Sequence, residues 1–141
     1  MSPRSLNRSG FIPSDGGACI VICARPGEAD QIGRCLSHIE SGYLLGYERV
    51  SDLVRNVPAG EVDLVVLVAD VGPAVLRRTL LWIKGRWRRC MCVVVGDGSG
   101  MARETAAREC GALYLNGPVS PEQWDGVLCG VKQLREAKLT S

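Results

Sequence analysis

The side chains best suited to metal or nucleophilic chemistry in this sequence are seven cysteines and a single histidine, His38. Two pairs have close spacings, CxxxC at Cys19/Cys23 and CxC at Cys90/Cys92, and neither is the CxxC spacing of common zinc sites. An odd number of cysteines, several in apolar strand-like runs, favours free buried thiols in a reducing compartment. We therefore expect no metal, no cofactor and no catalysis, and a redox role for the CxC pair remains as an alternative.

A glycine-rich stretch, GDGSG at residues 96–100, lies between a predicted strand and a predicted helix. Backbone amides in such a loop can bind phosphate. The stretch is neither the GxGxxG fingerprint nor a P-loop, so a flexible turn is the preferred interpretation. If the chain binds a small ligand, we expect the site at this loop together with Gly117.

Basic side chains are concentrated in one segment, because no acidic residue occurs between Asp70 and Asp97. Its basic residues, called the basic cluster below, are Arg77, Arg78, Lys84, Arg86, Arg88 and Arg89. Arginines beside Trp82 and Trp87 suit nucleic acid or an acidic protein partner. The alternative is a solvated helix face with the tryptophans packed inward.

The elements that position these residues follow an alternating pattern. Apolar runs predict five strands, at residues 18–24, 43–50, 62–68, 90–96 and 112–116, each followed by a helical segment. Right-handed crossovers then predict a three-layer α/β/α fold, a flavodoxin-like five-stranded parallel sheet of order 2-1-3-4-5. Residues 1–17 read as a flexible tail, and residues 18–141 as a single domain.

Bulk composition agrees with one globular domain, with 46% hydrophobic and 23% charged residues in 141. No apolar run approaches the roughly 20 residues needed to cross a bilayer, and the N-terminus lacks a signal-peptide core. We expect a cytoplasmic protein without membrane contact. Since few residues follow the last predicted helix, we also expect it to act through contacts with other molecules.

Three stretches carry a resemblance to a known family: CIVICARPGEADQI, VDLVVLVAD and GALYLNGPVSPEQW. With the alternating strands and helices, they make residues 18–138 resemble the receiver domain of two-component response regulators. The last stretch is the most specific, and its Pro118 matches the family's proline after the fifth strand. The resemblance implies phosphoryl transfer to an aspartate, assisted by Mg²⁺, a hydroxyl side chain and a lysine.

The positions that should perform this chemistry hold other residues. Ala24 and Arg25 stand in place of the acidic pair, and Val68 in place of the phosphorylated aspartate. Gly96 replaces the hydroxyl residue, and Gly117 replaces the lysine. The chain therefore resembles a pseudo-receiver that works without phosphorylation. A displaced acceptor at Asp70 is the less favoured alternative, because no acidic pair is evident near it to bring a metal.

One feature of the family is retained in Tyr114, which matches the aromatic residue that moves inward toward the hydroxyl position on activation. Because Gly96 leaves space there, we hypothesise that Tyr114 is held in one rotamer. A tyrosine simply packing on an exposed strand is the alternative. The resemblance implies a docking face on the helix 101–110, the strand 112–116 and the last helix, for a protein partner or a homodimer. Its candidate contacts are Arg103, Tyr114 and Trp124, although Trp124 is also a predicted core residue.

Overall fold

The computed structural model describes residues 4–5, 18–36, 43–68, 71–98 and 100–140. Its strands are β1 (Arg4–Ser5), β2 (Cys19–Cys23), β3 (Tyr43–Tyr47), β4 (Leu64–Val68), β5 (Met91–Gly96) and β6 (Leu113–Asn116). Its helices are α1 (Pro26–Leu36), α2 (Val50–Arg55), α3 (Pro73–Arg86), α4 (Met101–Glu109) and α5 (Pro121–Thr140). None of these helices is long and apolar enough to span a membrane.

The strands form one sheet of order β1-β3-β2-β4-β5-β6. Strands β2 to β6 are all parallel, so the predicted five-stranded order 2-1-3-4-5 is confirmed. The two-residue strand β1 adds to this sheet, antiparallel to β3. It lies within the segment 1–17 that we expected to be a flexible tail, and the prediction is wrong for these two residues. The rest of that segment is outside the described residues.

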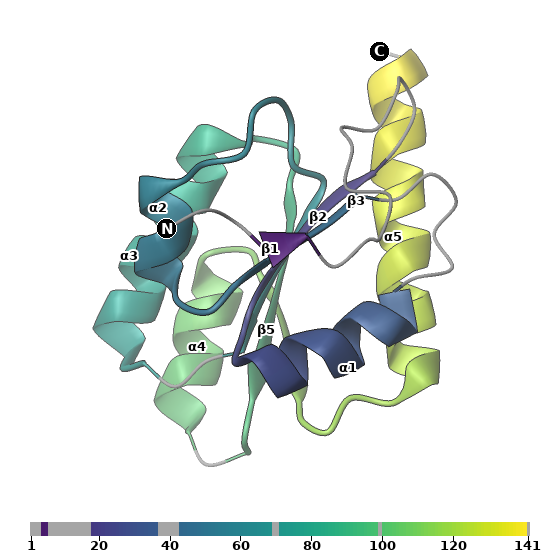
Figure 1. Ribbon diagram of the computed structural model, residues 1–141. Coiled ribbons are helices and arrows are strands. Elements are labelled where there is room, and N and C mark those ends of the chain that lie inside the picture. The colour runs from purple at the N-terminus through teal and green to yellow at the C-terminus, as the bar shows by residue number, and fades with distance from the viewer. Residues whose placement is uncertain (1–3, 6–17, 37–42, 69–70, 99, 141) are drawn as a thin grey trace.

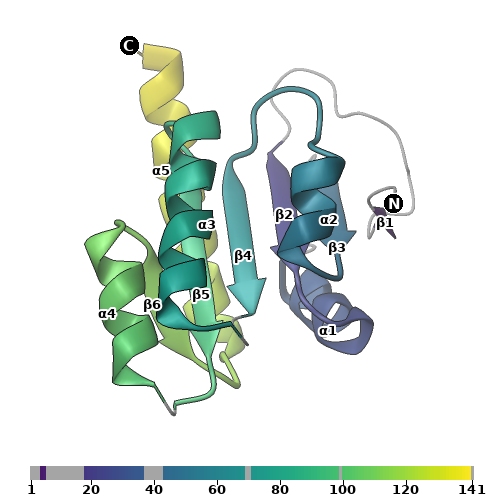
Figure 2. The same ribbon diagram turned by 90° about the vertical axis from the view of Figure 1, so that its left-hand side faces the viewer.

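Helices cover both faces of the sheet, which explains why its strands are continuously apolar. Helices α2, α3 and α4 lie on one face, and α1 and α5 lie on the other (Figure 1). Figure 2 looks onto the first of these faces, with α4, α3 and α2 in front of the strands. In β4 the side chains alternate between the two cores, with Val65 facing α3 and Val66 facing α5, and both are fully buried.

Side-chain hydrogen bonds stabilise the start of α5 and the amino edge of the sheet. Ser120 and Gln123 form a reciprocal capping box, in which the Ser120 amide donates to Gln123 Oε1 at 3.0 Å. The Gln123 amide donates in return to Ser120 Oγ at 3.2 Å. At the amino edge of the sheet, the buried Asp63 accepts a hydrogen bond from the Cys19 amide at 2.9 Å, and its other oxygen lies 4.0 Å from Arg135.

Candidate functional site

The five positions taken from the resemblance all lie at the carboxyl edge of the sheet, where folds of this kind bind ligands. Val68 ends β4, Gly96 ends β5 and Gly117 follows β6, and these three residues line one pocket. Ala24 is buried after β2, and its amide donates to the Tyr47 carbonyl at 3.0 Å. Arg25 is exposed, and neither it nor Ala24 belongs to the pocket lining.

The pocket has a volume of about 400 Å³ and lies between α1, the strand ends and the start of α5. Its lining consists of Glu28, Gln31, Ile32, Cys35, Val68, Val95, Gly96, Asp97, Gly117, Pro118, Val119 and Trp124. Most of these are apolar, two are carboxylates and none is basic. In the described part of the chain, no three His, Cys, Asp or Glu side chains form a group that could hold a metal ion.

Tyr114 occupies the space that a side chain at position 96 would need. Its ring points inward from β6, and only 7% of the residue is exposed. A Cβ atom built on Gly96 would overlap the Tyr114 hydroxyl and Cζ, and it would lie 3.1 Å from Cε1. A serine or threonine at position 96 is therefore incompatible with this placement of the tyrosine.

Gly117 closes the same end of the sheet through its backbone. Its amide donates to the Gly96 carbonyl at 2.7 Å, and the peptide bond from Gly117 to Pro118 is cis. A Cβ at Gly117 would lie 3.3 Å from both the Gly96 carbonyl oxygen and Val95 Cγ1, which is tighter than ordinary contact. Gly96 and Gly117 thus bring neither a hydroxyl nor an ammonium group to the pocket.

The loop at residues 96–100 contributes Gly96 and Asp97 to the pocket. Gly98 has a φ of 84°, a backbone conformation that favours glycine, which agrees with the turn interpretation. His38 and Asp70, which were considered above, and Ser99 of the 96–100 loop lie outside the described residues.

All seven cysteines are free thiols, and Cys129 is exposed. Burial raises the pKa of Cys19 and of Cys23 to about 12, with further contributions from Asp63 and Asp52 respectively. In the CxC pair, a hydrogen bond between the two thiols raises the pKa of Cys90 and lowers that of Cys92. Cys90 and Cys92 are each 2% exposed, which opposes reaction with dissolved reagents.

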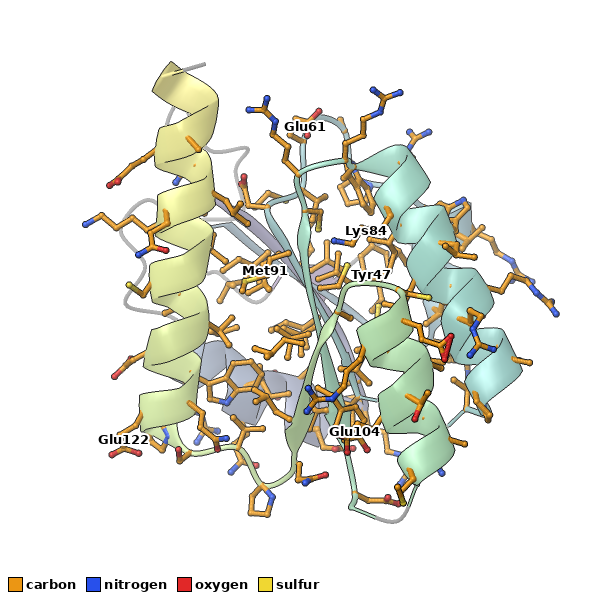
Figure 3. The ribbon with its side chains drawn as sticks, turned by 180° about the vertical axis from the view of Figure 1, so that it is seen from behind. Tyr47, Glu61, Lys84, Met91, Glu104 and Glu122 are labelled. Carbon is orange, nitrogen blue, oxygen red and sulfur yellow. The ribbon has the colours of Figure 1, made fainter. Side chains whose placement is uncertain are left out.

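The basic cluster does not form one surface. Arg77 forms an ion pair with Glu109 of α4 at 3.3 Å. Lys84 points toward the sheet (Figure 3), where its Nζ donates to the Cys90 carbonyl at 3.3 Å. The last three arginines of the cluster line a second pocket, of about 450 Å³, at the amino edge of the sheet. Its lining consists of Glu61, Gly85, Arg86, Arg88 and Arg89.

The two tryptophans beside the cluster face inward. Trp87 is 3% exposed and donates from Nε1 to the Gly60 carbonyl at 3.2 Å. The rings of Trp82 and Trp87 meet edge to face, with centroids 5.8 Å apart. Trp87 is therefore not available to stack on a nucleic-acid base.

No family model matches the sequence, and no curated protein matches it significantly. Solved structures do match. A signal receiver domain from Vibrio parahaemolyticus has a TM-score of 0.70 at 13% identity, over 93% of this chain and 98% of that one. A CheY-like receiver domain protein from Methanospirillum hungatei has a TM-score of 0.67 at 12% identity, over 85% and 98%. The BeF3-activated DrrB receiver domain has a TM-score of 0.62 at 21% identity, over 84% and 97%.

The chain has the receiver-domain fold. Two acidic residues that the sequence analysis did not select line the pocket. They are Glu28 in the first turn of α1 and Asp97 after β5. Both follow strands directly or after a short turn, and that position at the carboxyl edge was the signal that could have found them.

Trp124, selected as a partner contact, is 2% exposed and lines the pocket, so it is not available on the surface.

Proposed function

We propose that this chain is a receiver-like regulatory module that docks a protein partner or a second copy of itself, without phosphorylation and without catalysis. The observation that carries the proposal is the Tyr114 ring lying against Gly96, in the space of the missing hydroxyl residue. The resemblance to receivers implies that an inward aromatic accompanies the active arrangement of the docking face. In this chain the arrangement would need no phosphoryl group to maintain it.

The residues around the pocket support independence from phosphorylation. The Val68 side chain has no oxygen that could accept a phosphoryl group, and the resemblance implies carboxylates for Mg²⁺ at the position of Arg25, a positively charged residue. The pocket beside them is lined mostly by apolar side chains, a poor setting for a highly charged transition state.

The proposed docking face consists of α4, β6 and the adjoining side of α5. Figure 3 views the molecule from this side, with α5 at the left and α4 to the right of centre. Met101 is 86% exposed and Leu113 is 41% exposed, so this face presents two apolar side chains that a partner could cover. Arg103 is partly exposed on α4, and arginine is enriched in interfaces.

The docking experiment compares two matched variants, Leu113→Arg on the proposed face and Val54→Arg on α2, which are 41% and 46% exposed in the wild type. Self-association is measured by light scattering, and partners are captured from a native lysate after nuclease treatment. We expect Leu113→Arg to abolish the association and Val54→Arg to preserve it. Equal binding by both variants would reject the face.

A second experiment tests phosphorylation itself. The chain is incubated with Mg²⁺ and acetyl phosphate, and its intact mass is then measured. We expect no phosphoryl adduct, because the acceptor position is Val68. A stable adduct would contradict the proposal and would direct the search to Asp70.

An adaptor for nucleic acid or an acidic partner is the second candidate, favoured by the pocket lined by Arg86, Arg88 and Arg89. Binding through these arginines would fall steeply with salt. The variant with all three changed to Glu separates the two functions. If it loses all captured material and Leu113→Arg loses none, the arginine surface is the binding site.

A further inference from the structure

We propose that the outer edge of β6 pairs antiparallel with β6 of a second copy, so that the sheets of two chains join into one. This inference rests on the proposed docking face and names its partner as a second copy of this chain. Strand β6 ends the sheet on one side, with β5 as its neighbour (Figure 2). Among the described residues, no strand pairs with the other side of β6.

The hydrogen bonds to β5 show which backbone groups of β6 point outward. The Gly117 amide donates to the Gly96 carbonyl at 2.7 Å, so it points toward β5. The amide and carbonyl groups of a strand alternate in direction from one residue to the next. Those of Leu113 and Leu115 therefore point toward β5 as well, and those of Tyr114 and Asn116 point away from it.

The sequence of β6 contains nothing that opposes pairing at this edge. Its four residues, LYLN, include no charged side chain and no proline, which are the residues that commonly protect exposed edges. The opposite edge of the sheet is treated differently, because β1 pairs there with Leu45 and Gly46 of β3. The chain thus pairs one edge of its sheet with its own backbone and, in its described part, leaves β6 unpaired.

One register uses every outward group of β6. When Leu115 stands opposite Leu115 of the second copy on a two-fold axis, Tyr114 of each chain stands opposite Asn116 of the other. Each of these Tyr114–Asn116 pairs then exchanges both N–H···O bonds, as hydrogen-bonded pairs of antiparallel strands do. The same surface on both copies forms the contact, which is the condition for a closed two-fold dimer.

The neighbouring symmetric registers use fewer of these groups. Centring the axis on Tyr114 would place Asn116 opposite Ala112, whose amide already donates to the Ala107 carbonyl at 2.9 Å. Centring it on Asn116 would place Tyr114 opposite Pro118, which has no amide. The register centred on Leu115 is therefore the one that we expect.

The side chains of β6 agree with this register. Leu115 is partly buried beside the core under α5, and in the dimer it would contact its own copy across the axis. Leu113 is 41% exposed and would stand opposite Gly117 of the second copy, which has no side chain to oppose it. Because β6 carries no charge, nothing on the strand selects a charged peptide in place of a second copy.

Disulfide cross-linking tests the register. Leu115→Cys and Leu113→Cys are compared in a Cys129→Ser background, which removes the exposed thiol and serves as the baseline. Under mild oxidation, Leu115→Cys should give a covalent dimer, because residues opposite each other in such a pair have Cα atoms about 4.5 Å apart. Leu113→Cys should not, because its two copies would lie four positions out of register, roughly 13 Å along the strands. Absence of the Leu115→Cys dimer, or an equal yield from Leu113→Cys, would overturn the proposal.

A backbone variant separates strand pairing from docking in general. Asn116→Pro removes one outward amide from each copy and leaves the bonds from β6 to β5 intact, since proline is tolerated where its nitrogen faces outward from an edge strand. We expect dimerisation, measured by analytical ultracentrifugation, to weaken about 30-fold through the two lost hydrogen bonds, with a folded spectrum as the control.

The docking variant Leu113→Arg distinguishes the two proposals. Association that is lost in Leu113→Arg and unchanged in Asn116→Pro would keep the docking face and overturn strand pairing. A monomeric wild type that still captures a protein partner would also overturn strand pairing and keep the proposed function. A wild type that neither associates nor captures a partner would reject both.

Discussion

Substituting Gly96 by alanine should force the Tyr114 ring out of its buried position. Gly96 is the last residue of β5, and its φ is not in the positive range, so alanine is compatible with the backbone. The added methyl group would, however, overlap the Tyr114 hydroxyl and Cζ. The ring must therefore rotate toward solvent, since the hydroxyl end of a tyrosine ring cannot bend away by itself.

The expected cost follows from the surface that the ring returns to water. A buried tyrosine covers roughly 200 Å². If about half of this becomes exposed, at about 25 cal/mol per Å², the native state loses about 2.5 kcal/mol. Alanine offsets part of this by about 0.5 kcal/mol, because it reduces the conformational freedom of the unfolded chain. We expect Gly96→Ala to lower the free energy of unfolding by about 2 kcal/mol.

The measurement is urea unfolding of four proteins: wild type, Gly96→Ala, Tyr114→Ala and the double variant. Without the ring, the methyl group meets no overlap, so Gly96→Ala should be neutral or slightly stabilising in the Tyr114→Ala background. The coupling free energy should then be about 2 kcal/mol. Gly126→Ala is the matched control, because an added Cβ there has no neighbour within 4 Å and should stabilise α5 slightly.

A coupling free energy below about 0.5 kcal/mol would refute this reasoning, because independent sites add to within that margin. The same four proteins also test the proposed function. If the inward ring maintains the docking face, Gly96→Ala should weaken association while Gly126→Ala preserves it. Loss of stability without loss of association would keep the packing argument and remove its link to docking.

Three further outcomes follow from the structure. Asp63→Ala should lower the free energy of unfolding by about 1–3 kcal/mol, because the buried Cys19 amide loses its 2.9 Å acceptor, and Asp63→Asn should recover part of this in the same urea titrations. Trp87→Phe should cost about 1 kcal/mol through the lost hydrogen bond to the Gly60 carbonyl, and an unchanged midpoint would show that this bond contributes nothing. Burial raises the pKa of Cys19 and Cys23 from 9.0 to about 12, so stability is complete below pH 9 and is lost as pH rises toward 12. The free energy of unfolding then falls by at most about 1.4 kcal/mol per pH unit for each thiol, and Cys23→Ala should make this fall less steep.

The strands could be predicted because their signal is local, and their order followed from the rules for alternating strands and helices. A strand covered by helices on both faces must be apolar at every position, and VDLVVLV meets that condition whatever lies elsewhere in the chain. The prediction extended the second strand to residue 50, whereas β3 ends at Tyr47 and α2 begins at Val50. Strand β1 was missed because a two-residue edge strand has no periodicity to detect.

In the candidate site too, some features follow from residues close together in the sequence, and others need contacts between distant segments. The five positions taken from the resemblance follow from spacing within single strands and loops. The pocket does not, because it needs α1 beside the start of α5, and these segments are about 90 residues apart in the sequence. Division of the basic cluster is also a long-range effect, since the partner of Arg77 is Glu109 on the next helix.

The sequence by itself determined the alternating strands and helices, and the residue types at the five positions taken from the resemblance. These depend on side-chain type and on spacing along the chain. Only the tertiary structure decided that Tyr114 lies against Gly96, that Trp124 is enclosed, and that Glu28 and Asp97 share an apolar pocket. The direction in which a side chain points depends on the space left by residues distant in sequence, and that space exists only in the folded chain.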